Sequence, residues 1–134
     1  MPTITSKYLG TKEYLLVYSE LIAAARHRGL ITYQEIAQIM GLPLSGNHMS
    51  REVGQILGEI SDDERENDRP MISAIVVGVS GKPGLGLFAL AKQFERFDSE
   101  DEAARDHFVH QERQVVYDTW KRVLKQPSQR IVAE

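Results

Sequence analysis

The sequence predicts an α+β protein that is mostly helical, with a winged-helix-like core, a small β-hairpin and a long C-terminal helix. Three observations favour this class. Apolar residues recur at helical spacing over most of the chain, a β-branched run follows Pro70, and the turn-forming segment SGKPGLG follows that run. With 134 residues, of which 42% are hydrophobic and 26% charged, the chain matches one globular domain, residues 1–134.

The first two helices are predicted from their capping signals. Thr11 is a typical N-cap, and Gly29 follows a basic last turn, which together predict a helix over residues 12–28. A reciprocal cap between Thr32 and Glu35 begins a second, short helix within the segment ITYQEIAQIMGLP. The Gly and Pro at the end of that segment are the stop signals of a helix C-terminus.

A third helix is expected to begin near Ser50, and the acidic run 61–69 is expected to form its exposed end. The segment MISAIVVGV, residues 71–79, is then predicted to be a strand that leads into a tight glycine-rich loop. Over residues 31–90 this order of helix, helix, strand and loop is that of a winged helix, in which a β-hairpin wing follows a helix-turn-helix pair. The inward positions of the third helix are Val53, Ile56, Leu57 and Ile60.

The rest of the chain returns to helical spacing from Leu87 onward. A last helix is predicted over residues 99–125, with a capping pair formed by Ser99 and Glu102 and a stop at Pro127. Its apolar stripe either packs across the first helix of the same chain or forms a surface for a partner. The stripe residues of that candidate interface are Phe108, Val115, Val116 and Trp120.

The net charge of −3 is distributed unevenly. Residues 61–69 carry five acids against two arginines, and residues 98–106 carry five acids against one arginine. No segment is strongly basic. Because charge neutralisation of phosphates supplies most non-specific affinity for nucleic acid, tight DNA binding is not expected without a locally organised basic face.

Several classes of site and location are disfavoured by composition. The chain has no cysteine, which excludes disulfides, thiolate zinc sites and a cysteine nucleophile. No run approaches the roughly 18 apolar residues of a membrane span, and the N-terminus lacks a signal-peptide pattern. We therefore expect a soluble, cytoplasmic protein that is not an enzyme and that needs no cofactor.

Three segments between residues 31 and 90 carry a family resemblance: ITYQEIAQIMGLP, SREVGQIL and AIVVGVSGKPGLG. In this order they resemble the C-terminal winged-helix domain of the alkylguanine-DNA alkyltransferases and their alkyltransferase-like relatives. The resemblance implies DNA-contacting roles for Tyr33 and Arg51, the arginine entering the base stack as a target nucleotide is turned out. The family's reactive Pro-Cys-His-Arg segment should fall near residues 71–74, where this chain reads MISA. Alkyl transfer requires a thiolate, so that activity is excluded here.

A minimal DNA-binding face is predicted from the position of two cations. Arg51 lies near the start of the third helix, the end that enters a groove, and Lys82 lies on the presumed wing. Asn47, His48 and Ser50 are candidates to join them. The alternative is that Arg51 pairs locally on the surface and that Lys82 only contributes solubility. The DNA hypothesis requires that the two cations lie side by side.

Two histidines on the last helix were also weighed as metal ligands. His107 and His110 are three residues apart, and Asp106 or Glu102 could supply a third ligand. Because exposed helix histidines are far commoner than metal sites of this kind, we predict no metal. The leading hypothesis is a non-catalytic protein that binds DNA through the third helix and the wing. The alternatives are a protein-interaction or dimerisation module that uses the last helix, and a histidine-based metalloenzyme.

Overall fold

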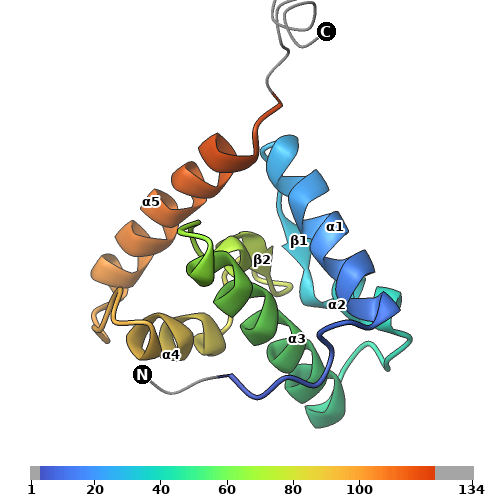
Figure 1. Cartoon of the computed structure of the whole chain (residues 1–134). Coiled ribbons are helices and arrows are strands. Elements are labelled where there is room, and N and C mark those ends of the chain that lie inside the picture. Colours follow the sequence, from blue (N-terminus) through green and yellow to red (C-terminus); the bar gives the residue numbers. More distant parts are fainter. Residues whose placement is uncertain (1–3, 123–134) are drawn as a thin grey trace, which may run out of the picture.

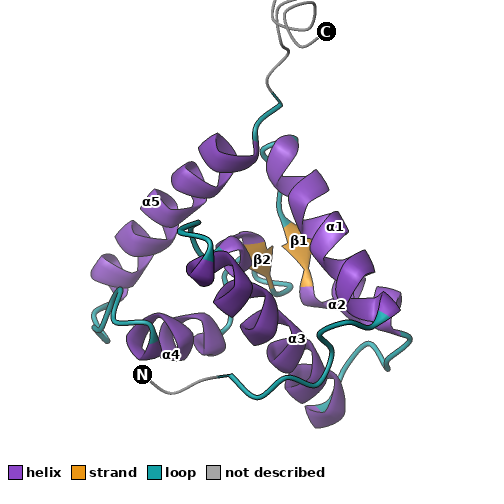
Figure 2. Cartoon of the chain, in the orientation of Figure 1, coloured by secondary structure: helices purple, strands orange, loops and turns teal. Residues whose placement is uncertain are grey.

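Helices account for most of the chain in the computed structural model, which describes residues 4–122 (Figure 1). A single parallel sheet of two short strands lies among them in this part of the chain (Figure 2). The fold is therefore mostly helical α+β, as predicted. The elements are α1 (Lys12–Arg26), β1 (Ile31–Thr32), α2 (Tyr33–Met40), α3 (Asn47–Glu66), the 3₁₀ helix η1 (Ile72–Ile75), β2 (Val76–Val77), α4 (Leu85–Gln93) and α5 (Glu102–Trp120).

The predicted N-terminal caps of the first two helices are confirmed, whereas the first helix is capped at its C-terminus by His27 and not by Gly29. The Thr11 hydroxyl accepts a hydrogen bond from the backbone N–H of Tyr14, and Thr32 and Glu35 form the reciprocal capping box of α2. The helix α1 ends at Arg26, two residues before the predicted end. Arg28 has a φ of 55°, which is left-handed and cannot continue a helix.

The two strands pair in parallel, with Ile31 opposite Val76 and Thr32 opposite Val77. The prediction of a strand over residues 71–79 is thus correct only for its centre. Residues 72–75 form the 3₁₀ helix instead, and every residue from 71 to 77 is buried. Periodicity alone cannot tell a buried strand from another buried apolar segment. Only the part of the run that reaches β1 finds a backbone partner for a ladder.

The predicted β-hairpin wing is wrong for this part of the chain. After β2 the chain makes a tight turn, in which the N–H of Gly78 donates to the carbonyl of Lys82 at 2.9 Å, and it then enters α4. The turn needs a glycine at position 81, where φ is +82°. A parallel pair requires a long connection rather than a hairpin, and here α2 and α3 supply it.

Two apolar clusters meet at η1. The larger one joins α1, α2, α3 and α5 around the buried stripe of α3, as predicted for that stripe. The smaller one packs α4 and part of α5 against the other side of the η1 segment, through Met71, Ala74, Leu87, Ala91, Phe94 and Val109. In Figure 1, α3 crosses the middle of the molecule, and α1 and α5 lie on either side of it. The centre of the fold is therefore the short, buried segment η1, which contacts α1, α3 and α5 and packs against α4.

The acidic run 61–69 forms the end of α3 as predicted, but it is exposed only at residues 66–68. The helix α3 begins at Asn47 and continues through most of the run, and the side chain of Glu64 is completely buried. Its carboxylate accepts hydrogen bonds from the Tyr18 hydroxyl, from Arg69 Nε at 2.8 Å and from Trp120 Nε1 at 3.0 Å. Glu64 lies four residues after the buried Ile60, so it continues the inward stripe of α3.

The last helix is shorter than the predicted 99–125. Its N-cap is Asp101, whose carboxylate accepts from the Ala104 N–H, and residues 123–125 lie outside the described part. The prediction that Val116 belongs to a partner surface is wrong, because Val116 is fully buried in the chain's own core. Phe108 is half-buried and stacks on Phe97 with ring centroids 4.6 Å apart, and Trp120 is half-buried. The stripe therefore packs against the same chain except at Val115, which is exposed. Among residues 4–122, no helix is both long and apolar enough to cross a bilayer.

Candidate functional site

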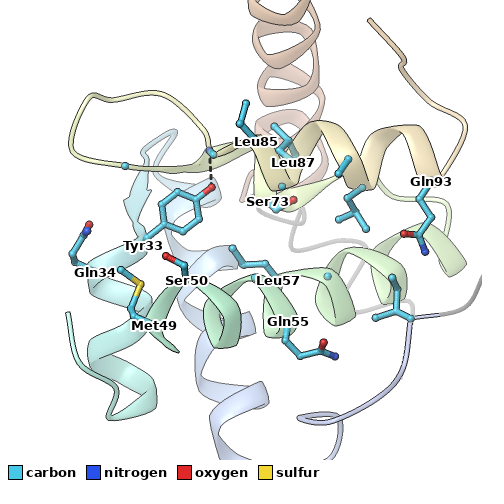
Figure 3. A pocket seen from close by; sticks show the side chains of 18 of the residues that line it. Tyr33, Gln34, Met49, Ser50, Gln55, Leu57, Ser73, Leu85, Leu87 and Gln93 are labelled. Atoms are coloured by element: carbon cyan, nitrogen blue, oxygen red, sulfur yellow. Dashed lines mark hydrogen bonds between the residues drawn. The ribbon is translucent and has the colours of Figure 1, made fainter. Parts of the chain in front are cut away.

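A cavity of about 670 Å³ lies between α3 and α4, and we call it the α3–α4 cavity (Figure 3). Its walls come from distant parts of the sequence: α2, α3, η1, the loop after β2, and α4. The floor along α3 is made by Ser50, Gly54 and Gly58, which are four residues apart and therefore share one helix face. A Cβ at Gly54 would meet no atom within 4 Å, so the missing side chains leave the space open.

The lining of the α3–α4 cavity is uncharged. Among the described residues that form it there is no aspartate, glutamate, histidine, lysine or arginine. Its apolar members include Met49, Leu57, Leu85 and Leu87. Its polar members offer only amides and hydroxyls, from Tyr33, Gln34, Ser50, Gln55, Ser73 and Gln93. Such a lining favours a neutral ligand with apolar faces and hydrogen-bonding edges.

Tyr33 fixes one wall of this cavity. Its side chain projects from the first residue of α2, and its hydroxyl accepts a hydrogen bond of 2.7 Å from the backbone N–H of Gly84 (Figure 3). Burial raises the pKa of Tyr33, while the hydrogen bond from Gly84 acts in the opposite direction. The tyrosine therefore stays protonated at neutral pH, and it joins α2 to the loop that precedes α4.

The Tyr33–Gly84 contact predicts an effect of adding one methyl group. A Cβ at Gly84 would lie 2.8 Å from the Tyr33 hydroxyl oxygen, which is too close. Gly84→Ala is therefore expected to lower the free energy of unfolding by about 1 kcal/mol. Gly86→Ala is the matched control, because its Cβ would meet nothing within 4 Å. Urea unfolding of both variants measures the difference, and equal stabilities would contradict the described contact.

The structure brings some of the predicted DNA-binding residues to this cavity. Tyr33 and Ser50 line it. Asn47 begins α3 and is exposed, and Arg51 lies one turn into α3 with 69% of its side chain exposed. Arg51 contacts only its own helix, with Nη2 3.4 Å from His48 Nδ1 and Nε 3.7 Å from the Glu52 carboxylate. Both distances are long and the arginine itself is exposed, so these contacts hold the guanidinium weakly.

Lys82 lies in the loop that follows β2, and its side chain is directed toward α5. Its Nζ is 3.4 Å from the carboxylate of Glu102 at the start of α5, and both side chains are exposed. It lines a separate cavity against α5 rather than the α3–α4 cavity. Arg51 and Lys82 thus share no partner among the described residues. The predicted two-cation face is therefore not formed, and DNA binding through the third helix together with a wing, which required the two cations to lie side by side, is not supported.

Sequence reasoning missed most of the polar lining of the α3–α4 cavity. Ser73 lies in the segment that was expected to be a strand, and its hydroxyl accepts from the Ser61 hydroxyl at 3.0 Å. Gln34, Gln55 and Gln93 come from three different helices. One signal was available for the floor: the spacing of Ser50, Gly54 and Gly58 puts three small residues on one face of a helix.

The N-terminal segment, residues 4–9, is held along α3 beside this cavity. The Glu59 carboxylate accepts from the backbone N–H groups of Lys7, Tyr8 and Leu9 at 2.9–3.1 Å. The Glu52 carboxylate accepts from the Lys7 ammonium at 2.5 Å and from the Tyr8 hydroxyl. This anchoring brings Ile4 to the rim of the cavity.

Acid is expected to release the N-terminal segment. Hydrogen bonds from Lys7 and Tyr8 lower the pKa of Glu52 from 4.5 to about 2. Burial alone would raise the pKa of Glu59, but hydrogen bonds from Gln55 and three backbone N–H groups lower it overall. Because both values are depressed, the anchoring is complete above pH 4.5 and is lost as the pH falls toward about 2.

Amide NMR signals of Tyr8 and Leu9 followed against pH test this prediction. Glu59→Gln should shift these signals toward their acid positions already at neutral pH, whereas Glu20→Gln, at an exposed position on α1, should leave them in place. Signals that do not move as the pH falls below 4.5 would contradict it.

No group of three histidine or carboxylate side chains in residues 4–122 is arranged to hold a metal ion. His107 and His110 are both exposed on α5. Comparison with family models, with curated proteins and with solved structures finds no match to this chain.

Proposed function

We propose that this protein binds nucleic acid along α3 and accepts an unpaired base in the α3–α4 cavity. The observation that carries the proposal is the uncharged cavity of about 670 Å³, which opens along the face of α3 that bears Ser50, next to Arg51. A base that leaves the stack needs a pocket with apolar faces and a few hydrogen-bonding groups for its edge. Leu57, Met49 and Leu85 offer apolar surface, and the amides and hydroxyls offer donors and acceptors.

The arrangement of α2 and α3 supports contact with a nucleic-acid backbone. The two helices are consecutive and packed against each other, although residues 41–46 make the connection longer than the turn of a typical helix-turn-helix pair. Asn47 and Arg51 are exposed on the first turns of α3, the end that approaches a groove in such proteins. Because Glu52 and His48 hold Arg51 only weakly, its guanidinium is free to move to a phosphate or a base step.

The family resemblance points to the same place. Tyr33, for which the resemblance implies a DNA-contacting role, lies at the cavity wall. The segment 71–74, which aligns with the reactive segment of the alkyltransferases, contributes Ser73 to that wall. Here the position offers a hydroxyl that is hydrogen-bonded to Ser61 and no thiolate. The described lining has no carboxylate, histidine or lysine to act as a general base, and the Tyr33 hydroxyl is held by Gly84, so binding is favoured over catalysis.

Weak, salt-dependent binding is the expected result in solution. With about one phosphate contact, through Arg51, affinity should fall roughly threefold to fourfold between about 50 and 200 mM salt. Arg51→Ala should weaken binding severalfold and flatten the salt dependence by about one contact. Fluorescence anisotropy titration of labelled duplexes and single strands at low salt measures both effects.

Lys92→Ala provides a matched control, because Lys92 is exposed on α4 and does not line the cavity. Absence of binding to every duplex and single strand at low salt would remove the proposal. The alternative of a dimer through α5 has less support, because Val116 is buried and Trp120 donates to Glu64. Light scattering would reveal such a dimer as a doubled mass.

A further inference from the structure

A second cavity, of about 420 Å³, lies between the loop that follows β2 and α5, and we call it the loop–α5 cavity. Its character is opposite to that of the α3–α4 cavity. Three cationic side chains line it, from Lys82, Arg105 and Arg113, against the two carboxylates of Glu102 and Asp106. Glu102 and Asp106 are both exposed. The lining is therefore cationic, and its counter-charges are well solvated.

Arg113 is the least satisfied of these cations. It is half-buried, and its Nε donates to the carbonyl of Ala74 at 2.7 Å. Its Nη2 is buried and has no hydrogen-bond partner in the described part of the chain. The adjacent Glu112 carboxylate is already occupied by Arg96 at 2.9 Å and by the N–H of Met71 at 2.8 Å. A guanidinium that is partly removed from water without a counter-ion is costly, so this position favours an anion.

Arg105 and Lys82 are placed to join Arg113. The Nε of Arg105 donates to the carbonyl of Ser99 at 2.8 Å, and its guanidinium lies 4.5 Å from the centre of the Phe88 ring. These two contacts fix the orientation of the guanidinium and leave its terminal N–H groups for a ligand. The exposed Lys82–Glu102 pair, at 3.4 Å, is weak enough for a competing anion to displace.

We propose that the loop–α5 cavity binds an oxyanion, a phosphate or a carboxylate group, through Arg113, Arg105 and Lys82. Guanidinium groups match the geometry of such oxygens and form charge-assisted hydrogen bonds with them. The ligand is held beside the same loop that walls the α3–α4 cavity, and Leu85 contributes to both cavities. This site does not depend on the proposed binding of nucleic acid.

Titration of the full chain with inorganic phosphate, sodium acetate and sodium chloride at matched ionic strength tests the site without nucleic acid. The expected result is saturable movement of the side-chain NMR signals of Arg105 and Arg113 with phosphate or acetate but not with chloride. Tighter binding of phosphate assigns a phosphate ligand, and tighter binding of acetate assigns a carboxylate. Equal responses to all three salts, or no saturable response, would overturn the proposal.

Variants distinguish anion binding in the loop–α5 cavity from non-specific screening of surface charge. Arg113→Gln should weaken anion binding about tenfold, and Lys82→Ala by about threefold. Lys92→Ala, an exposed cation outside the cavity, should leave it unchanged. If Arg113→Gln does not fold, as judged by circular dichroism, then Arg105→Gln and Lys82→Ala decide the matter. Unchanged binding in folded cavity variants would show that the anion is held elsewhere and would overturn the assignment.

Discussion

Replacing Glu64 with alanine is expected to destabilise the protein by about 3 kcal/mol, because it removes the acceptor for three buried or half-buried donors. Glu64 is fully buried, and its carboxylate joins α1 through Tyr18, the chain after α3 through Arg69, and the end of α5 through Trp120. Its loss leaves the Arg69 guanidinium without its carboxylate beside the Trp120 ring. Urea unfolding followed by Trp fluorescence measures the change.

Two further substitutions, Glu66→Ala and Glu64→Gln, serve as controls. Glu66→Ala removes an exposed carboxylate two residues along the same helix and should change stability by no more than about 0.5 kcal/mol. Glu64→Gln keeps the size and one acceptor oxygen, so its cost should lie between the two. If Glu64→Ala were no more destabilising than Glu66→Ala, the described network would not contribute to stability.

Filling the α3–α4 cavity from its floor is expected to abolish base binding while the fold persists. Gly54 is exposed on α3, and a Cβ there meets nothing within 4 Å, so Gly54→Phe can extend a ring into the cavity. Affinity for a duplex with an unpaired base should fall at least about tenfold, since the base loses its pocket. Anisotropy titration measures the loss.

The variant Gly54→Ala distinguishes blocking of the α3–α4 cavity from a change in the stability of α3. A glycine inside a helix costs about 0.5–1 kcal/mol relative to alanine, so both substitutions should raise the stability of α3. Only the phenylalanine is large enough to occupy the cavity. If the two variants bound the mismatched duplex equally well, the cavity would not be the base-binding site.

Features set by neighbouring residues were predictable from the sequence. The capping box of Thr32 and Glu35 and the N-cap Thr11 depend on contacts within one helical turn, which the sequence displays directly. The inward stripe of α3 was recognised for the same reason. The parallel pairing of Ile31 with Val76 was not, because the partner strand is distant in sequence and only two residues long.

The site was less predictable than the helices. Glu64 lies in an acidic run that looks solvated, and only its register with Ile60 shows that it points inward. The α3–α4 cavity arises where Gly54 and Gly58 leave space opposite α4, and that juxtaposition depends on tertiary packing. Tyr33 and Arg51 were singled out through the resemblance. Lys82 was expected beside Arg51, but it faces Glu102 instead, since the loop leads into α4 rather than into a hairpin.

Comparing affinities for two duplexes of the same sequence, one fully paired and one with a single mismatched base pair, tests the account most directly. Extruding a base costs a few kcal/mol, and the cost is least where pairing is already lost. The chain should therefore bind the mismatched duplex at least about tenfold more tightly, and Gly54→Phe should erase that preference. Equal affinities for both duplexes, or a preference that survives in Gly54→Phe, would contradict a base-accepting cavity beside α3.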